Sequence, residues 1–411
     1  MKKYIIISMC VIMSSFSFSQ TLTKAKIDSA IASLRSNDPL ILIQATKIIG
    51  NYDLYEAIPE LESNIVQKRM SDQIIFLQAL VRLKAENSHA FVTSYINKLE
   101  NYEPQESELF NPVELKLRAI QLLFLLNDYS YSDFVFGKVT DTTQRNHNII
   151  VNMLYLLLNN SKENELKAKN DLIYGARYGE EIRGLCIDIL EDKYGIEMLP
   201  LIVERFKEDE DFSVRLSILN DEFLRYESNL INDALKDRLL SEPSEIIRSK
   251  IARNLLVELG TISNYKYAID WLYSSDTTDS ALKKRIMLEL KLIYPNTPPL
   301  PNISVTVETM LDTLISYTNQ CYGFEWLKDA DYENELFSII QNAQNHLQSS
   351  DSLSCAKEIK SFQESIEQVY ADFAGNYPKY ISDEAYKFLY YYPKYILERL
   401  PEIPGVSSKE K

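Results

Sequence analysis

The feature that most constrains the fold is an apolar pattern that recurs along much of the chain. In the segment DFSVRLSIL, which begins at Asp211, a capping residue precedes apolar residues at helical spacing. The full pattern places apolar or small residues three, seven and eleven positions after the capping residue. Copies begin at residues 38, 72, 114, 146, 179, 211, 244 and 279, so successive starts lie 34, 42, 32, 33, 32, 33 and 35 residues apart. So steady a period indicates an array of repeated units.

Each copy predicts one helix with a capped start and one apolar face. The predicted core positions in the better copies are Ile41, Ala45 and Ile49; Ile75, Ala79 and Leu83; Ile149, Met153 and Leu157; Ile182, Cys186 and Leu190; Ile247, Ile251 and Leu255; and Leu282, Ile286 and Leu290. The copies from residues 114 and 211 each have one polar residue at such a position, Gln121 and Glu222.

A second amphipathic segment precedes each of these helices, for example GIEMLPLIVERF from Gly195. Each unit is therefore expected to be a helical hairpin, and stacked hairpins form an α-solenoid. The chain has only 10 glycines in 411 residues, which disfavours turn-rich β folds and favours helix. The sequence thus predicts an all-α protein with a solenoid of about eight hairpins over residues 22–294.

The first unit, DPLILIQATKIIGNYDLYEAIPELESNI, resembles the short HEAT-like repeats of bacterial proteins. In that family an arginine after the first core residue commonly links neighbouring repeats. The matching positions here hold Arg118, Arg183, Arg215 and Arg248, so the resemblance implies a structural role for these four arginines. The other four units depart from the family pattern, with Leu42, Phe76, Ile150 and Lys283 at this place. The resemblance is specific for the fold and implies little about function.

The single long gap between units holds an acidic insertion with two prolines, LENYEPQESELFNPVE, over residues 99–114. Insertions in solenoids form loops on one face and sometimes bind partners. A tolerated, solvated loop is the favoured interpretation, because lengthening a surface loop costs little free energy. A binding feature stays open as the alternative.

A different organisation begins at YPNTPPLPN, where four prolines end the helical array. We expect a proline-rich linker at residues 295–304, a small bundle of four helices at 305–400 and a tail at 401–411. Ser382 is the expected N-cap of the fourth helix. The segments LDTLISYTNQCY and CAKEIKSFQESIEQV resemble the short helical domain, sometimes called FIMAH, that ends many secreted bacterial proteins. In that family the domain supplies no catalytic residues.

The first 20 residues, MKKYIIISMCVIMSSFSFSQ, have the pattern of a secretory signal peptide. Two lysines precede an apolar stretch too short to span a bilayer comfortably, and cleavage is expected between Ser19 and Gln20, so residues 1–19 would be removed. A lipoprotein site at Cys10 is disfavoured because Met9 precedes it, and an uncleaved anchor is the weaker alternative. The mature chain is expected to be periplasmic or secreted.

The charge limits which partners are possible. Formal net charge is −15, with a pI near 4.9, and removing Lys2 and Lys3 would take the mature chain from −15 to −17. Such a chain lacks the electrostatic basis for binding nucleic acid or an anionic membrane. A protein partner with a basic surface is compatible with this charge, and association should then slow as salt is raised.

The sequence offers no motif for catalysis, cofactors or metals. His89, His147 and His346 lie in different units and in no ligand pattern, while DADYENE from Asp329 lacks the glycine of a calcium loop. We therefore assign no catalytic, cofactor-binding or metal-binding residue and expect no cofactor. Acidic runs such as KEDEDF are interpreted as solvated turns.

Cysteines and tyrosines are also expected to be structural. Cys186 occupies a core position, and Cys321 and Cys355 are expected at opposite ends of the bundle, too far apart for a disulfide. Tyr390, Tyr391, Tyr392 and Tyr395 could form an aromatic patch for sugar rings. The favoured interpretation is that about half of these four tyrosines belong to the core of the fourth helix and the rest cover it.

These observations favour a non-catalytic protein-binding scaffold or adaptor that works outside the cytoplasm. A solenoid offers a long, rigid surface for partners, although a fold alone does not determine function. Two alternatives stay open: an enzyme or accessory subunit with a site of dispersed carboxylates, and a module that binds glycans or the cell wall.

Overall fold

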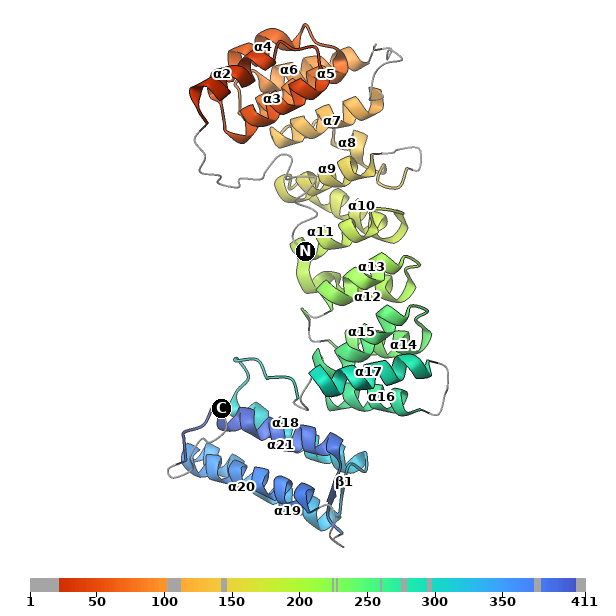
Figure 1. Cartoon of the computed structure of the whole chain (residues 1–411), viewed down its shortest axis with the longest axis vertical. Coiled ribbons are helices and arrows are strands. Elements are labelled where there is room, and N and C mark those ends of the chain that lie inside the picture. Colours follow the sequence, from red (N-terminus) through yellow and green to blue (C-terminus); the bar gives the residue numbers. More distant parts are fainter. Residues whose placement is uncertain are drawn as a thin grey trace. The chain divides into compact units, whose positions relative to one another are not determined.

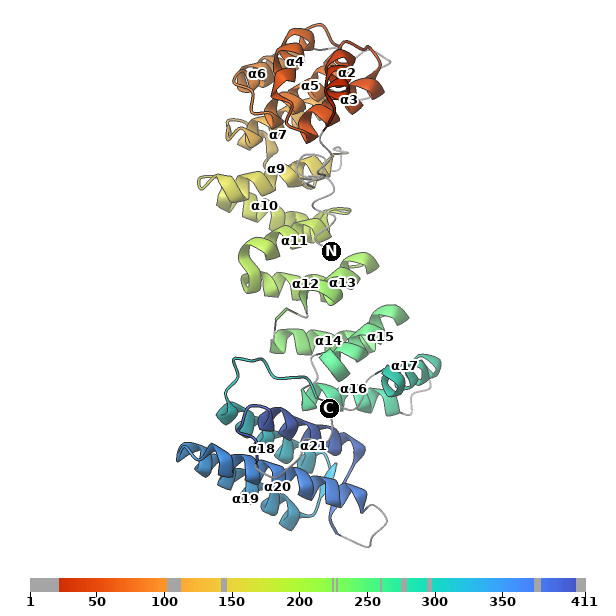
Figure 2. The ribbon, with the colours of Figure 1, turned by 60° about the vertical axis from the view of Figure 1, so that its left-hand side comes forward.

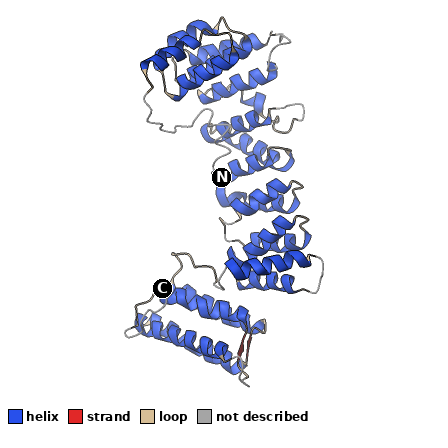
Figure 3. Ribbon diagram, in the orientation of Figure 1, coloured by secondary structure: helices blue, strands red, loops and turns tan. Residues whose placement is uncertain are grey.

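The computed structural model describes residues 22–100, 102, 112–141, 146–223, 225–226, 228–258, 261–274, 279–293, 298–372 and 378–403. The all-α prediction is confirmed. Within these residues the regular structure is helical apart from one pair of two-residue strands (Figure 3). The expected signal peptide with Cys10, most of the acidic insertion and most of the C-terminal tail lie outside the described residues.

The chain divides into two compact units, Met1–Arg205 and Phe206–Lys411, and each is considered by itself. This division does not coincide with the proline-rich segment, so the domain boundaries drawn from the sequence stay predictions. No described helix is long and apolar enough to cross a membrane.

In the first unit successive helices form a layered stack (Figures 1 and 2). Its elements are α2 (Lys24–Ser33), α3 (Pro39–Asn51), η1 (Tyr55–Ala57), α4 (Ile58–Ile65), α5 (Met70–Arg82), α6 (Ser88–Leu99), α7 (Pro112–Leu125), α8 (Ser132–Val135), α9 (His147–Asn160), α10 (Glu165–Tyr178), α11 (Arg183–Tyr194), η2 (Gly195–Met198) and α12 (Leu199–Glu208), which spans the division. Helix α3 packs on α5, α5 on α7, α7 on α9 and α9 on α11. Helix α6 packs on both α5 and α7, and α10 packs on both α9 and α11.

The second unit begins with shorter, interrupted helices. These are α13 (Phe212–Ser217), η3 (Ile218–Glu222), α14 (Asn229–Ser241), α15 (Glu245–Arg253), η4 (Asn254–Glu258), α16 (Ile262–Tyr273) and α17 (Ser280–Ile293). Both η3 and η4 are π-helical turns, which insert an extra residue into a helix. The extra residue in η3 explains why the repeat pattern fails at Glu222. The next residue, Phe223, is the buried one, and its ring packs 4.7 Å from that of Phe206.

The four predicted helices of the C-terminal bundle are present, and they belong to this second unit. They are α18 (Val307–Gly323), α19 (Ala330–Gln348), α20 (Ser352–Ala371) and α21 (Asp383–Leu397), with strands β1 (Leu327–Lys328) and β2 (Tyr380–Ile381). The strands pair antiparallel, with Leu327 opposite Ile381. One apolar core, which includes Leu314, Leu336 and Phe362, fills the bundle.

The described part of the proline-rich segment lies against the bundle. Tyr395 donates a hydrogen bond to the carbonyl of Pro298 at 2.7 Å. The guanidinium of Arg399 donates to the carbonyls of Pro301 at 3.0 Å and Asn302 at 2.9 Å, and also to that of Val305. These hydrogen bonds hold the segment that precedes α18 against the C-terminal end of α21.

Several predicted helix starts are confirmed. Asp38, Asp211, Ser244 and Ser382 are N-caps whose side chains accept a hydrogen bond from a backbone N–H in the first turn.

Three other predicted starts are wrong. Asp72 and Glu114 lie inside the first turns of α5 and α7, where they pair with the nearby Arg69 and Arg118. Gly179 ends α10 and does not begin α11. A carboxylate in the first turn still interacts favourably with the helix dipole, which is why Asp72 and Glu114 resemble caps in the sequence.

In the repeat that starts at residue 38, one predicted core position is wrong. Ile41 is 42% exposed, whereas Leu42 is fully buried. Phe76 and Ile150, which follow the first predicted core residue in their own sequence repeats, are fully buried as well. An apolar residue at this place enters the core and turns the preceding isoleucine outward. The side chain of Leu290 lies outside the described residues.

Two of the four arginines pair with a carboxylate outside their own helix. Arg215 on α13 donates to both carboxylate oxygens of Glu242, at 3.0 and 2.9 Å, and Arg248 on α15 pairs with Asp279. Arg118 pairs with Glu114 of its own helix. Both of the links between helices described here, at Arg215 and Arg248, lie in the second unit.

Candidate functional site

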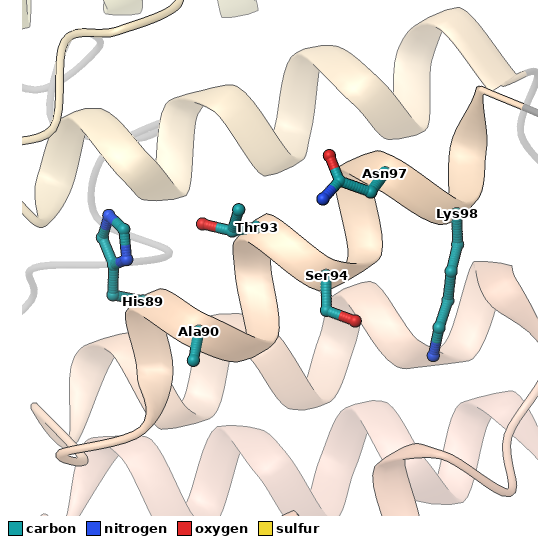
Figure 4. A pocket seen from close by; sticks show the side chains of 6 residues that line it. All are labelled: His89, Ala90, Thr93, Ser94, Asn97 and Lys98. Carbon is teal, nitrogen blue, oxygen red and sulfur yellow. The ribbon is translucent and has the colours of Figure 1, made fainter.

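The best candidate for a binding surface is an open groove along the outer face of α6 in the first unit (Figure 4). It is lined by His89, Ala90, Thr93, Ser94, Asn97 and Lys98. His89, Thr93 and Asn97 follow one another at four-residue intervals along one edge of the helix. Ala90, Ser94 and Lys98 do the same along the other edge. Two such rows border a furrow that can receive side chains of another segment.

The groove is held in place by the inner face of the same helix. Val92, Tyr95, Ile96 and Leu99 are buried at helical spacing, and the Tyr95 hydroxyl donates to the carbonyl of Met70 at 2.8 Å. The apolar side of α6 is thereby fixed against α5 and α7. Its polar side faces outward because it has no apolar residue to bury.

A carboxylate from the end of α7 closes one end of the groove. Asn127 adopts the left-handed conformation, φ 63°, which asparagine tolerates well and which ends α7. The chain then places Asp128 Oδ2 2.7 Å from His89 Nε2. Burial raises the pKa of Asp128, but hydrogen bonds from the Ser130 N–H and from His89 outweigh it and hold that pKa below its usual range.

One buried polar atom in this region, the hydroxyl oxygen Oγ1 of Thr93, lacks a hydrogen bond. Threonine in a helix usually bonds the carbonyl four residues earlier, and a buried hydroxyl without a partner costs about 1–3 kcal/mol.

The groove presents several polar side chains, but their geometry is not that of a hydrolytic triad. His89 is paired with Asp128, and both Thr93 and Ser94 offer hydroxyls on the same helix. A nucleophile needs a hydrogen bond to its base, and Thr93 makes no hydrogen bond at all. Bond-breaking chemistry therefore finds no support in this arrangement.

The residues considered from the sequence lie apart from one another. His147 Nε2 lies 3.0 Å from the carbonyl of Asp141, and His346 lies beside Asp351, so the three histidines do not converge. Asp329 caps α19 by accepting from the Tyr332 N–H. Within the described residues no group of three histidine, cysteine, aspartate or glutamate side chains is placed to hold a metal.

The carboxylates whose pKa is raised are also separate. Burial raises the pKa of Asp171 in the first unit, against a hydrogen bond from the Gly137 N–H at 2.7 Å. Burial likewise raises the pKa of Glu333, which belongs to the second unit. Neither pKa is raised by a neighbouring carboxylate. These two residues therefore give no specific support to an enzyme with a site of dispersed carboxylates.

The cysteines are buried and unpaired: Cys186, Cys321 and Cys355 all have free thiols. Burial raises the pKa of each, to about 11 for Cys355. The thiolate fraction near neutral pH is therefore very small, which suits the packing role predicted for Cys186.

Of the four tyrosines considered on the last helix, one is buried, where about half were expected in the core. Tyr392 is buried, while Tyr390, Tyr391 and Tyr395 are half-buried. Tyr390 stacks on Tyr386 at 4.6 Å with an interplanar angle of 11°, so each ring covers a face of the other. A sugar-binding platform needs free ring faces, and this stacking covers one face of Tyr390.

Comparison with known proteins adds no functional information. No protein-family model matches the chain, and no curated protein matches it. Among solved structures an engineered protein is similar at 12% identity, over 90% of this chain and 98% of that one, with a TM-score of 0.28. A likeness this weak supports no conclusion about fold or function.

Proposed function

We propose that the protein is a non-catalytic scaffold outside the cytoplasm and that the α6 groove contacts a segment of a partner protein. The observation that carries the proposal is the open groove itself, which two rows of residues at four-residue spacing border along one helix. Ala90 and Ser94 leave room for a helix or extended segment to approach closely. Ser94 and Asn97 are exposed, and their hydroxyl and amide groups can form hydrogen bonds with such a segment.

The polar groups at the ends of the groove suit a peptide segment better than a small molecule. The His89–Asp128 pair stands at one end and Lys98 in the last turn of α6 at the other. Small-molecule sites are usually enclosed and mostly apolar, whereas this groove is open and mixed. Peptide segments carry regularly spaced amide groups that can meet hydroxyl and amide side chains along a helix.

The location outside the cytoplasm rests on the signal-peptide pattern of residues 1–19, and the acidic charge makes a basic partner compatible. If long-range attraction steers the partner, the association rate should fall as ionic strength rises. A rate that does not change with salt would exclude a partner recruited by charge, while leaving the groove contact itself in place.

The test is cross-linking of the mature chain in native envelope and culture fluid, with mass spectrometry of linked peptides. Ala90→Arg fills the groove and is compared with Ala32→Arg, since both alanines are exposed on short helices of the first unit. The expected result is links between α6 and one partner that Ala90→Arg abolishes and Ala32→Arg preserves. Partner capture that is equal in both variants would refute the groove as the contact site.

A further inference from the structure

Three tyrosines form a stacked column where α20 packs against α21 (Figure 1). The ring of Tyr370, in the last turn of α20, lies 3.9 Å from that of Tyr386, with an interplanar angle of 22°. Tyr386 in turn stacks on Tyr390 at 4.6 Å and 11°. All three are half-buried, so part of each phenol is reachable from solvent. Close parallel rings from two helices are less common than offset or edge-on pairs.

The two ends of this column carry opposite charges. At one end the Tyr370 hydroxyl donates to Asp383 Oδ1 at 2.8 Å, and this bond raises the pKa of Tyr370 above its usual value. At the other end the ammonium of Lys394 lies 4.9 Å from the ring centre of Tyr390. A carboxylate can take the phenol proton as an electron leaves, whereas a cation over a ring opposes loss of that electron. Oxidation is thus favoured at Tyr370 and disfavoured at Tyr390.

We propose that Tyr370 and Tyr386 are a site of oxidative cross-linking, where a peroxide-driven one-electron oxidant joins the two rings. Each phenol loses one electron to the oxidant and its hydroxyl proton, which Asp383 receives first in the case of Tyr370. The two phenoxyl radicals couple through ring carbons ortho to oxygen, and the ring hydrogens then return the oxygens to hydroxyls. The product has lost two hydrogen atoms, and one hydrogen peroxide is reduced to two waters.

Among the described tyrosine pairs, this one has the shortest distance between ring centres, 3.9 Å. Radicals held in contact couple in a unimolecular step, and prior orientation of reacting groups is worth many orders of magnitude in effective concentration. The Tyr386–Tyr390 pair shares a helix and has the cation beside it. The Tyr370–Tyr386 pair joins two helices, so its product would fasten the end of α20 to the start of α21.

The experiment treats the purified full chain with a peroxidase and hydrogen peroxide, then maps cross-linked peptides by mass spectrometry. The expected product is an intrachain Tyr370–Tyr386 link with loss of two hydrogens. Its initial rate per molecule should not depend on protein concentration. Tyr370→Phe and Tyr386→Phe should each abolish the link while keeping the ring packing, and Tyr390→Phe should retain it. Circular dichroism before oxidation verifies that each variant is folded.

Asp383→Asn separates a role in proton transfer from simple packing. An amide keeps a hydrogen-bond acceptor beside Tyr370 but is a far weaker base, so the initial rate should fall roughly tenfold or more. The exposed pair Tyr174 and Tyr178, 4.6 Å apart but tilted by 53°, provides an internal comparison. Links at that pair or between molecules, with none between Tyr370 and Tyr386, would overturn the proposal.

Discussion

Lys387 lies in the second unit among apolar and aromatic groups, and its charge should make that unit less stable at neutral pH than at mildly alkaline pH. The side chain is 6% exposed. Its ammonium donates to the carbonyl of Leu256 in η4 at 3.4 Å and lies 4.3 Å from the ring centre of Tyr265 on α16. Burial lowers the pKa of Lys387 from 10.5 to about 8. One long hydrogen bond and one cation–π contact do not replace the lost hydration.

The magnitude follows from the shift in pKa. A change from 10.5 to about 8 corresponds to about 3.4 kcal/mol at ~1.36 kcal/mol per unit. Because the folded state binds fewer protons than the unfolded state between these values, stability rises with pH across the window. The unit should therefore gain about 2 kcal/mol between pH 7 and pH 9.5 from this group alone. The gain is absent below the folded pKa, where both states are protonated.

The assay is urea unfolding followed by tryptophan emission at several pH values. The chain has two tryptophans, Trp271 and Trp326, and both belong to the second unit, so the signal reports that unit alone. Lys387→Met should remove the alkaline gain and raise stability at pH 7 by about 1–3 kcal/mol. The increase stays below the full shift because methionine leaves the Leu256 carbonyl without its donor.

Lys394→Met is the matched control for this experiment. Lys394 lies on the same helix, half-buried over the rings of Tyr390 and Tyr391, and its replacement should leave the alkaline gain intact. Equal pH profiles for the wild-type chain and Lys387→Met would refute the reasoning, because they would show that Lys387 titrates alike in the folded and unfolded states.

Other substitutions test the buried ion pairs, the packing and the groove. Arg215→Met should cost about 1.5–3 kcal/mol in urea unfolding because it removes two hydrogen bonds from the buried Glu242, which keeps its pairing with Arg238, whereas Arg35→Met, at an exposed pair, should change little. Gly175→Ala should destabilise by about 1–3 kcal/mol, since its Cβ would lie 2.9 Å from a thiol sulfur, while Gly184→Ala, with open space around it, should stabilise by about 0.5–1 kcal/mol. Thr93→Val should stabilise the chain by about 1 kcal/mol in urea unfolding, because it replaces a buried hydroxyl that makes no hydrogen bond, and a loss of stability would contradict this reasoning.

Much of the secondary structure could be predicted because its causes are local. Asp38, Ser244 and Ser382 cap helices through bonds to N–H groups two or three residues away, and such signals are visible in a short window of sequence. The four helices of the bundle follow from apolar stripes of period 3.6. The strands β1 and β2 were missed because each has two residues and pairs with a segment more than fifty positions away.

The register errors have a tertiary cause. A 3-4-4 stripe fixes which side of a helix is apolar, but two adjacent apolar residues, such as Ile41 and Leu42, leave the rotation of that helix undetermined. Packing against α5 selects Leu42. The π-helical turns also have a tertiary cause. The wider hydrogen-bond spacing in η3 is less stable than an α-helical turn by itself, and it is compensated when Phe223 packs against Phe206. No local signal in the sequence gives either outcome.

The candidate groove could not be located from the sequence for a related reason. SHAFVTSYINKL is an ordinary amphipathic helix, and its outer residues are the small and polar types found on any solvated face. The distinguishing facts are a hydrogen bond that is missing at Thr93 and a carboxylate that arrives from the end of α7. Both depend on where other elements lie.

The way the first unit is packed implies that binding and stability can be changed separately on α6. Helices α3, α5, α7, α9 and α11 contact one another in series, and the inner side of α6 adds its buried residues to α5 and α7. The groove residues Ala90, Ser94 and Asn97 are exposed and contribute no apolar area to these contacts. Substitutions there should alter recognition while leaving unfolding nearly unchanged, because surface changes away from packed or buried polar groups usually stay within about 0.5 kcal/mol. Thr93 is the exception, since its hydroxyl is buried without a hydrogen bond, and a substitution there should change stability.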